Sequence, residues 1–175
     1  MRRLWLRHPR PAVRPGTCYG RLDVAEGPTA AAEIAAALRL APPVAAVWAS
    51  PSRRCRQLAR RLAARDGVAL HLDTRLLELD FGRWEGMAWD EISRAESDPW
   101  AADPWALAPP GGERFADLHA RIAAVLETAP DEVALVCHAG PIRAGRMQLG
   151  GESFETAFAH PVPYAFPLDL TREPV

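Results

Sequence analysis

The chain has 175 residues, of which 49% are apolar and 25% charged, and its formal net charge is -1. This length and composition fit one globular unit with a sizeable core, so we expect a single domain over residues 1–175. The balanced charge disfavours a protein that binds nucleic acid through a basic surface, and no apolar run is long enough to span a membrane. All 21 basic residues are arginine, a side chain that grips phosphate through a forked pair of hydrogen bonds.

The cysteines and the N-terminus bear on where the protein works. The cysteines are Cys18, Cys55 and Cys137, and they show no CxxC spacing. Neither a disulfide framework nor a structural zinc site is therefore indicated. The N-terminus has no apolar leader segment, so we expect a cytoplasmic protein.

The first half of the chain alternates between strand and helix patterns. In chain order, these patterns predict a strand at 3–8, a helix at 29–40, a strand at 44–49, a helix at 52–65 and a strand at 68–72. Within the second helix, Cys55, Leu58 and Leu62 follow the spacing of an inner, apolar face. Prolines after the first strand and the first helix end both elements.

The second half begins with an irregular, proline-rich excursion from Ser97 to Gly112. The pattern then predicts a helix at 113–127, a buried strand at 133–137, a short helix from Pro141 and an edge strand near 162–170. Strands that alternate with helices are typical of a parallel sheet covered on both faces. We therefore predict a three-layer α/β/α fold with a mostly parallel central sheet.

Reactive side chains stand at several predicted strand ends. The first strand ends in Arg7 and His8, Arg54 opens the helix after the second strand, and His138 follows the strand at 133–137. In an open α/β sheet, ligands bind at the carboxyl ends of the strands. We expect these four side chains to meet at one edge of the sheet, together with Glu78 from the segment between them.

This set of side chains suits phosphoryl transfer. A transferring phosphoryl group spreads negative charge over its oxygens, so the protein must mainly position and neutralise it. Arg7 and Arg54 provide charge-assisted hydrogen bonds for this task, and Arg54 also lies at a helix N-terminus. A neutral imidazole is a nucleophile for phosphorus, and a carboxylic acid such as Glu78 can protonate the leaving oxygen.

Six segments of the chain match a known family in content, order and spacing. They are LRHPRP (6–11), CYGRLDVA (18–25), SPSRRCRQLA (50–59), LLELDFGRWEG (76–86), PGGERF (110–115) and VCHAGPIRA (136–144). Together they resemble the histidine phosphatase superfamily, also called the phosphoglycerate mutase-like family. Within that family the chain is most similar to the α-ribazole phosphatase branch.

The resemblance implies a role for each candidate residue. His8 becomes phosphorylated, Arg7 and Arg54 bind the phosphoryl group, His138 contacts it from the other side, and Glu78 is the general acid. No metal ion or other cofactor is implied. The substrate implied is a small phosphorylated metabolite, with α-ribazole 5′-phosphate of cobalamin synthesis as the specific candidate.

The chain departs from the family pattern at three positions. Pro9 and Ala139 stand where many members have glycine, and Arg114 stands where serine is common. Proline removes a backbone N–H from the loop after His8. We expect the carboxylates of Asp80, Glu85 and Glu113 to act as helix caps or ion-pair partners rather than as catalysts.

Four of the six tryptophans follow Glu78 closely in the sequence. We expect Trp84 and Trp89 to pack in the core. Trp100 and Trp105 lie in the excursion from Ser97 to Gly112, so we expect one of them to line the mouth of the substrate site. There its ring would stack on an aromatic base.

Three other functions remain open at this point. Residues Cys137 to Arg143 match the Cys-x5-Arg loop of cysteine phosphatases, although Pro141 removes an amide that such a loop uses to hold phosphate. A metal hydrolase built on His8 and His138 lacks a local ligand pattern such as HExxH. A phosphoglycerate mutase-like phosphotransferase is disfavoured because such mutases are generally longer.

Overall fold

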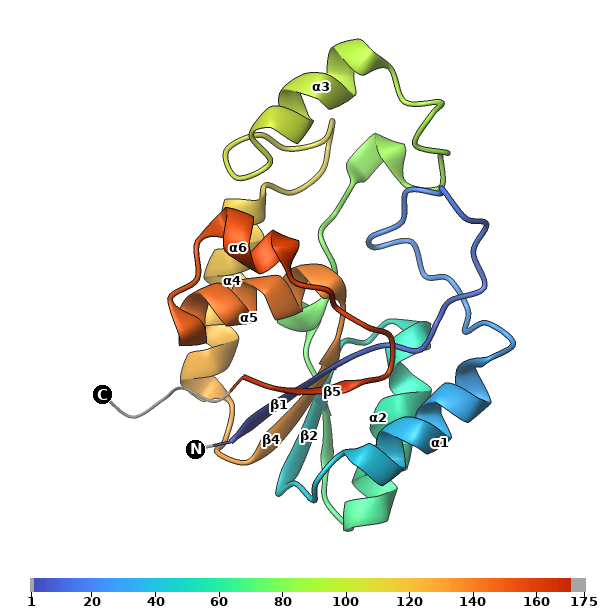
Figure 1. Ribbon diagram of the computed structural model, residues 1–175, viewed down its shortest axis with the longest axis vertical. Coiled ribbons are helices and arrows are strands. Elements are labelled where there is room, and N and C mark those ends of the chain that lie inside the picture. The colour runs from blue at the N-terminus through green and yellow to red at the C-terminus, as the bar shows by residue number, and fades with distance from the viewer. Residues whose placement is uncertain (1, 171–175) are drawn as a thin grey trace.

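A five-stranded sheet lies at the centre of the computed structural model, which describes residues 2–170 (Figure 1). The strands are β1 (Arg3–Arg7), β2 (Ala46–Ala49), β3 (Leu70–Leu72), β4 (Val133–Cys137) and β5 (Pro167–Asp169). The helices are α1 (Ala30–Leu40), α2 (Arg53–Asp66), α3 (Arg94–Ala102), α4 (Phe115–Thr128), α5 (Ala139–Gly150) and α6 (Phe154–Ala159). Two single turns of 3-10 helix, at Thr74–Leu76 and Gly82–Trp84, lie between β3 and α3.

The strand order is β3-β2-β4-β1-β5. The first four strands are parallel, and β5 pairs antiparallel with β1 at the edge. Every residue of β4 is buried, as are the first four of β1, and the apolar residues of β4 and of Leu4–Leu6 are typical of strands covered on both faces. The prediction of a mostly parallel sheet with a late edge strand is confirmed.

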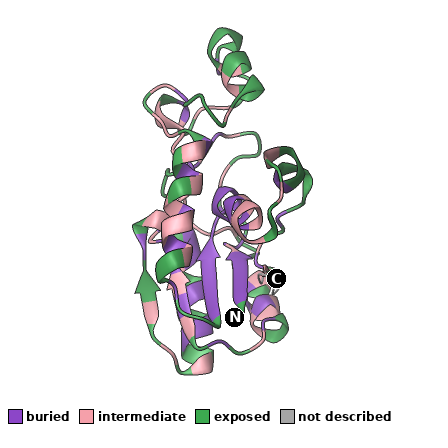
Figure 2. Cartoon of the chain, turned by 90° about the vertical axis from the view of Figure 1, so that its left-hand side faces the viewer, coloured by how far each residue is buried: buried purple, intermediate pink, exposed green. Residues whose placement is uncertain are grey.

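Helices cover both faces of the sheet. Figure 1 shows α1 and α2 on one side of the strands and α4 and α5 on the other, with α6 against α5. Ile34, Leu58 and Leu62 pack in one apolar layer, and Leu118 and Ile142 belong to the other. Figure 2 shows the central strands buried between these layers, and the three-layer prediction is confirmed. No helix among residues 2–170 is long and apolar enough to cross a membrane.

A close contact holds α5 against the sheet. A Cβ atom at Gly145 would lie 2.8 Å from the indole of Trp5, which is fully buried in β1. Glycine is therefore required for this approach, because a methyl group at that distance forces the helix or the indole to move. The contact fixes the position of α5 along β1, so that the helix begins at the carboxyl edge of the sheet.

The segment from Ser97 to Gly112 was expected to be irregular, but the structure shows that it begins inside a helix. Helix α3 covers Arg94–Ala102 and carries Pro99 in its interior. The helix begins after Ser93, and Glu96 in its first turn completes the Ser-x-x-Glu pattern of a helix start, a signal that Pro99 obscured. Helix α5 is also longer than predicted, because Pro141 lies in its first turn, where a missing N–H breaks no helical bond.

We predict that Leu58→Ala lowers the free energy of unfolding by about 2–5 kcal/mol, because the side chain is fully buried between α2 and the sheet and its loss leaves a cavity. Leu40→Ala removes the same atoms from a side chain that is 57% exposed and is the matched control. Denaturant unfolding monitored by circular dichroism measures both variants. Equal losses of stability would contradict the assigned packing.

Candidate active site

The carboxyl ends of three neighbouring strands carry the polar side chains of the site. His8 follows β1, His138 follows β4 and Ser50 follows β2. The amide of His8 donates to the Cys137 carbonyl at 3.0 Å, so the two strands remain in register up to their ends. The imidazole centroids of His8 and His138 are 5.2 Å apart. The structure therefore brings both predicted histidines together.

His8 is held as a neutral ring in one orientation. It is 1% exposed, and its Nδ1 lies 2.6 Å from the carbonyl oxygen of Pro9. Because a carbonyl only accepts hydrogen bonds, Nδ1 carries the proton and Nε2 keeps a lone pair. Burial lowers the pKa of His8 well below its ordinary 6.5, and the charges of Arg54 and Arg7 lower it further.

His138 is fully buried beside this ring. Its Nε2 lies 2.9 Å from the hydroxyl of Ser50, and its Nδ1 is buried without a hydrogen-bond partner among the described residues. Burial again lowers the pKa well below 6.5, with Arg54 and His8 as the next largest causes. An unpartnered buried ring nitrogen carries a desolvation cost.

The two predicted arginines each donate hydrogen bonds to oxygen atoms of loops. Arg7 donates to the Val162 carbonyl at 3.0 Å and to the Tyr164 hydroxyl at 3.1 Å, and its guanidinium lies 3.8 Å from the centre of the Tyr164 ring. Arg54, which is completely buried, donates to the carbonyls of Gly20 and Leu22 at 2.6 and 2.8 Å. The Nε of each arginine is buried and has no partner among residues 2–170, so each keeps donors for an anion.

Glu78 faces the start of α5. Its two carboxylate oxygens accept from the Gly140 amide at 3.1 and 3.2 Å. A Cβ at Gly140 would lie 2.3 Å from this carboxylate, so only glycine allows the contact. Arg121 of α4 holds the Glu78 segment by donating to the Leu77 and Glu78 carbonyls, and it forms a 2.8 Å ion pair with Glu113.

A cavity of about 220 Å³ opens above these groups. Three of the predicted residues, Arg7, His8 and Glu78, line it together with Arg143. The rest of its lining is rich in aromatic rings, namely Tyr19, Phe81, Trp89, Trp100, Phe115 and Phe158. The combination of a polar floor and apolar walls is typical of a small-molecule site.

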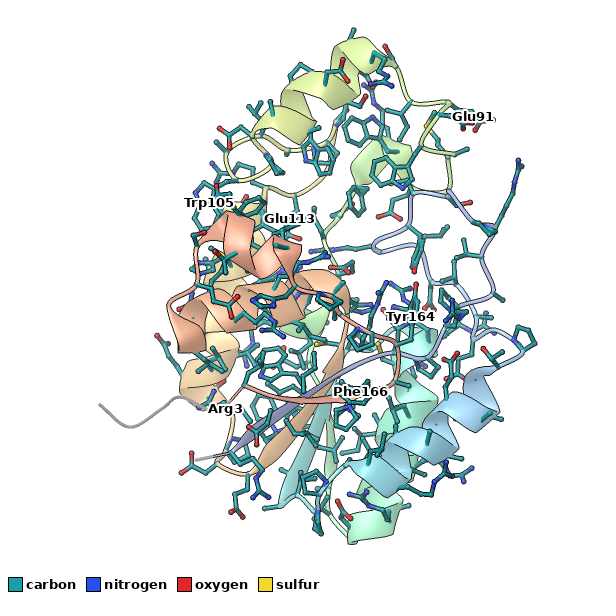
Figure 3. All side chains as sticks on the ribbon, in the orientation of Figure 1. Arg3, Glu91, Trp105, Glu113, Tyr164 and Phe166 are labelled. Atoms are coloured by element: carbon teal, nitrogen blue, oxygen red, sulfur yellow. The ribbon has the colours of Figure 1, made fainter. Side chains whose placement is uncertain are left out.

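The tryptophans divide differently from the prediction. Trp100 lines the cavity, whereas Trp105 packs against Phe115, His119 and Phe154 beside α6 (Figure 3). Trp84 is buried as expected. Trp89 is not a core residue: it is 40% exposed, lines the cavity and stacks on Trp100 with the ring centroids 6.1 Å apart. The expectation that Trp100 or Trp105 lines the cavity is therefore met by Trp100, and the prediction for Trp89 is wrong because the sequence pattern does not give the chain path around α3.

Among the cavity residues that the sequence did not assign to the site are Arg143 and Tyr19. Arg143 of α5 lies with its guanidinium 4.5 Å from the centre of the Phe158 ring, and its Nε is buried without a partner among the described residues. It lies one helical turn beyond Gly140, which is the signal that would have placed it at this edge. Tyr19 bonds to the Tyr164 hydroxyl at 3.2 Å, and burial raises its pKa to about 12.

The cysteine of the Cys-x5-Arg segment lies elsewhere. Cys137 is completely buried in the apolar layer under α4 and α5, and burial raises its pKa well above the ordinary 9.0. A thiol in this state is a poor nucleophile, because the thiolate is the reactive form. Cys137 does not line the cavity, although Arg143 does. The geometry therefore favours histidine over cysteine as the reacting group.

Comparison with known proteins places this fold and site in one family. The model of the histidine phosphatase superfamily (branch 1) matches residues 5–167. The chain belongs to this superfamily, which comprises phosphomonoester hydrolases.

Individual relatives are distant. A solved mycobacterial glucosyl-3-phosphoglycerate phosphatase is 27% identical, with a TM-score of 0.76 over 90% of this chain and 83% of its own. The α-ribazole phosphatase of Shigella flexneri has a TM-score of 0.84 over 94% of this chain and 87% of its own, but its 20% identity shows the fold alone. A Mycobacterium tuberculosis protein described as bifunctional is 37% identical over 84 residues, which are 45% of this chain and 22% of that protein.

We predict that the free energy of unfolding falls as the pH drops below about 6.5, the ordinary pKa of histidine. The pKa values of His8 and His138 are lower in the folded state than in the unfolded state, so only the unfolded chain takes up protons in this range. Each histidine then contributes a slope of up to about 1.4 kcal/mol per pH unit. His8→Gln and His138→Gln should each reduce the slope measured by denaturant unfolding between about pH 5 and pH 7.5.

Leu58→Ala is the control for this measurement, because it lowers stability at every pH and should keep the wild-type slope. Wild-type slopes in both histidine variants would show that these rings titrate alike in the folded and unfolded chains.

Proposed function

We propose that this chain is a metal-independent phosphomonoester hydrolase that acts in the cytoplasm through a phosphohistidine at His8. The observation that carries the proposal is the state of His8. Its Nδ1–H is bound to the Pro9 carbonyl, and its pKa is lowered by burial and by two arginines. Nε2 is thus an unprotonated nucleophile at neutral pH, and it lies where Arg7 and Arg54 can neutralise a phosphoryl group.

The proposed reaction has two steps. In the first, the Nε2 lone pair of His8 forms a bond to phosphorus, the ester P–O bond breaks, and protonated Glu78 gives its proton to the leaving oxygen. In the second, Glu78 takes a proton from water, the water oxygen bonds to phosphorus, and the P–N bond breaks to return the electron pair to His8. Arg7, Arg54 and His138 hold the phosphoryl oxygens through both steps.

We further propose that the substrate is a small phosphorylated metabolite with a planar aromatic group, and that α-ribazole 5′-phosphate or the cobalamin phosphate that contains it is the specific candidate. The support is the aromatic lining, in which the stacked Trp89 and Trp100 form a wall above the polar floor. Planar rings gain about 0.5–1.5 kcal/mol from such contacts beyond the area that they bury.

The first test is hydrolysis of p-nitrophenyl phosphate in the presence of a chelator. Wild-type protein should release phosphate, and His8→Ala should lose about a thousandfold or more of kcat, because no other group replaces the nucleophile. Thiol alkylation should spare the wild type, since the Cys137 thiol is buried. Activity of His8→Ala equal to wild type, or inactivation by alkylation, would favour the Cys137 mechanism, and loss of activity on chelation would favour a metal hydrolase.

A second test concerns the substrate. Trp89→Ala and Trp100→Ala should each raise KM for α-ribazole 5′-phosphate by about three- to tenfold, the equivalent of one aromatic contact. Trp105→Ala should leave KM unchanged, because Trp105 packs outside the cavity. Glycerol phosphate, which has no ring, should respond to none of the three changes. Faster turnover of glucosyl-3-phosphoglycerate than of α-ribazole 5′-phosphate would remove the specific substrate and leave the reaction class intact.

A further inference from the structure

We infer that Glu85 is a positioning residue that fixes Arg54 against the phosphoryl group through the peptide segment 20–22. The inference rests on the proposed function, in which Arg54 binds phosphate. Glu85 was expected to be a helix cap or an ion-pair partner. In the structure it forms no ion pair among the described residues, and its carboxylate binds backbone amides, one of which belongs to Phe81 at the start of the 3-10 turn Gly82–Trp84.

The carboxylate of Glu85 accepts four backbone N–H groups. Three belong to consecutive residues, Gly20, Arg21 and Leu22, at 2.9, 2.8 and 3.0 Å, and the fourth is the amide of Phe81 at 3.0 Å. Hydrogen bonds to an ionised acceptor are about twice as strong as those between neutral groups. Four such hydrogen bonds on one carboxylate fix the position and the backbone orientation of the loop at residues 20–22.

The opposite side of the same loop holds Arg54. The carbonyls of Gly20 and Leu22 accept from its two terminal nitrogens, and no salt bridge joins Arg54 to a carboxylate among residues 2–170. The C=O of Gly20 and the N–H of Arg21 are parts of one peptide group. That group therefore lies between the Arg54 cation and the Glu85 anion, with its dipole aligned to stabilise both charges.

The peptide group between Glu85 and Arg54 helps to compensate the buried charge of Arg54. Arg54 has no exposed surface, and a buried guanidinium without compensation is costly. A carboxylate in direct contact would neutralise Arg54 and compete with a phosphate for its donors. A carboxylate one peptide group away stabilises the cation without occupying its donors, and the Nε of Arg54 is buried without a partner among the described residues.

The same residue couples Arg54 to the segment that carries Glu78. Glu85 also binds the Phe81 amide, three residues beyond Glu78. A Cβ at Gly20 would lie 1.9 Å from the Leu79 carbonyl, so the loop and this segment are in backbone contact. Glu85 thus sets the position of the phosphate-binding arginine relative to that of the proposed general acid.

The test uses inorganic phosphate as a competitive inhibitor of p-nitrophenyl phosphate hydrolysis by the full chain. Glu85→Gln keeps the shape of the side chain, loses its charge and places an NH2 group against the loop amides. We expect it to raise the inhibition constant for phosphate about tenfold, which is one charge-assisted hydrogen bond. Glu85→Asp, with the charge kept but the reach shortened, is the second variant if Glu85→Gln does not fold.

Arg54→Met and the double variant distinguish positioning from general support. If Glu85 acts through Arg54, then Arg54→Met raises the inhibition constant and Glu85→Gln adds nothing to it in the double variant. Asp66→Asn is the control, because Asp66 also accepts a loop amide, that of Val44, but lies at the distant end of α2. It should lower the melting temperature without changing phosphate inhibition.

Three results would overturn the inference, and they are distinguishable. If Arg54→Met weakens phosphate inhibition but Glu85→Gln only lowers the melting temperature, as Asp66→Asn does, then Glu85 is purely structural and the proposed function stands. If Arg54→Met leaves inhibition unchanged, then the phosphate role of Arg54 is wrong and the role of Glu85 falls with it. Multiplicative effects in the double variant would likewise show that Glu85 acts independently of Arg54.

Discussion

An uncharged histidine enclosed beside two arginines is the constraint on which the rest of the site depends. Burial and the positive charges act in the same direction, and both keep the proton off the His8 ring. The same burial would destabilise the arginines if they had no partners. Loops 20–22 and 162–164 therefore turn oxygen atoms towards them, and the chain around the sheet edge is shaped by this need.

The arginines of the site are in contact with neutral oxygen atoms, and most of the carboxylates that balance their charge are not in direct contact with them. Nearest to His8 are cations, and the oxygen atoms that hold them belong to neutral carbonyls and a hydroxyl. The carboxylate of Glu78 lines the same cavity, whereas two other carboxylates lie behind the groups that hold the site: Glu85 behind the loop at residues 20–22, and Glu113 behind Arg121. An anion that enters the cavity therefore meets guanidinium groups whose countercharges are held at a distance, and this order favours binding of phosphate over closure of internal salt bridges.

The parts of the fold that follow from local pattern were predictable. Buried parallel strands need long apolar runs, and the reactive residues directly after β1 and β4 share an edge because parallel strands end on the same side. The predictions failed where a local signal conflicted with tertiary context. Helix α3 was not predicted because Pro99 lies in its interior, and α6 was not predicted because its six residues are too few for a helical pattern. The position of Trp89 at the cavity instead of in the core was missed, because it depends on how the chain crosses the cavity.

Helix α3 contributes no buried residue, yet Trp100 on its last turn and the adjoining Trp89 form one wall of the cavity. Both tryptophans also line another cavity, of about 330 Å³. The aromatic wall thus lies on a segment that packs only partly against the hydrophobic layers, while His8 and His138 follow strands of the buried sheet. On the proposed function, substitutions in this segment would alter which leaving groups fit without touching the residues at the strand ends, so proteins with this architecture can diverge in substrate while they keep the same chemistry.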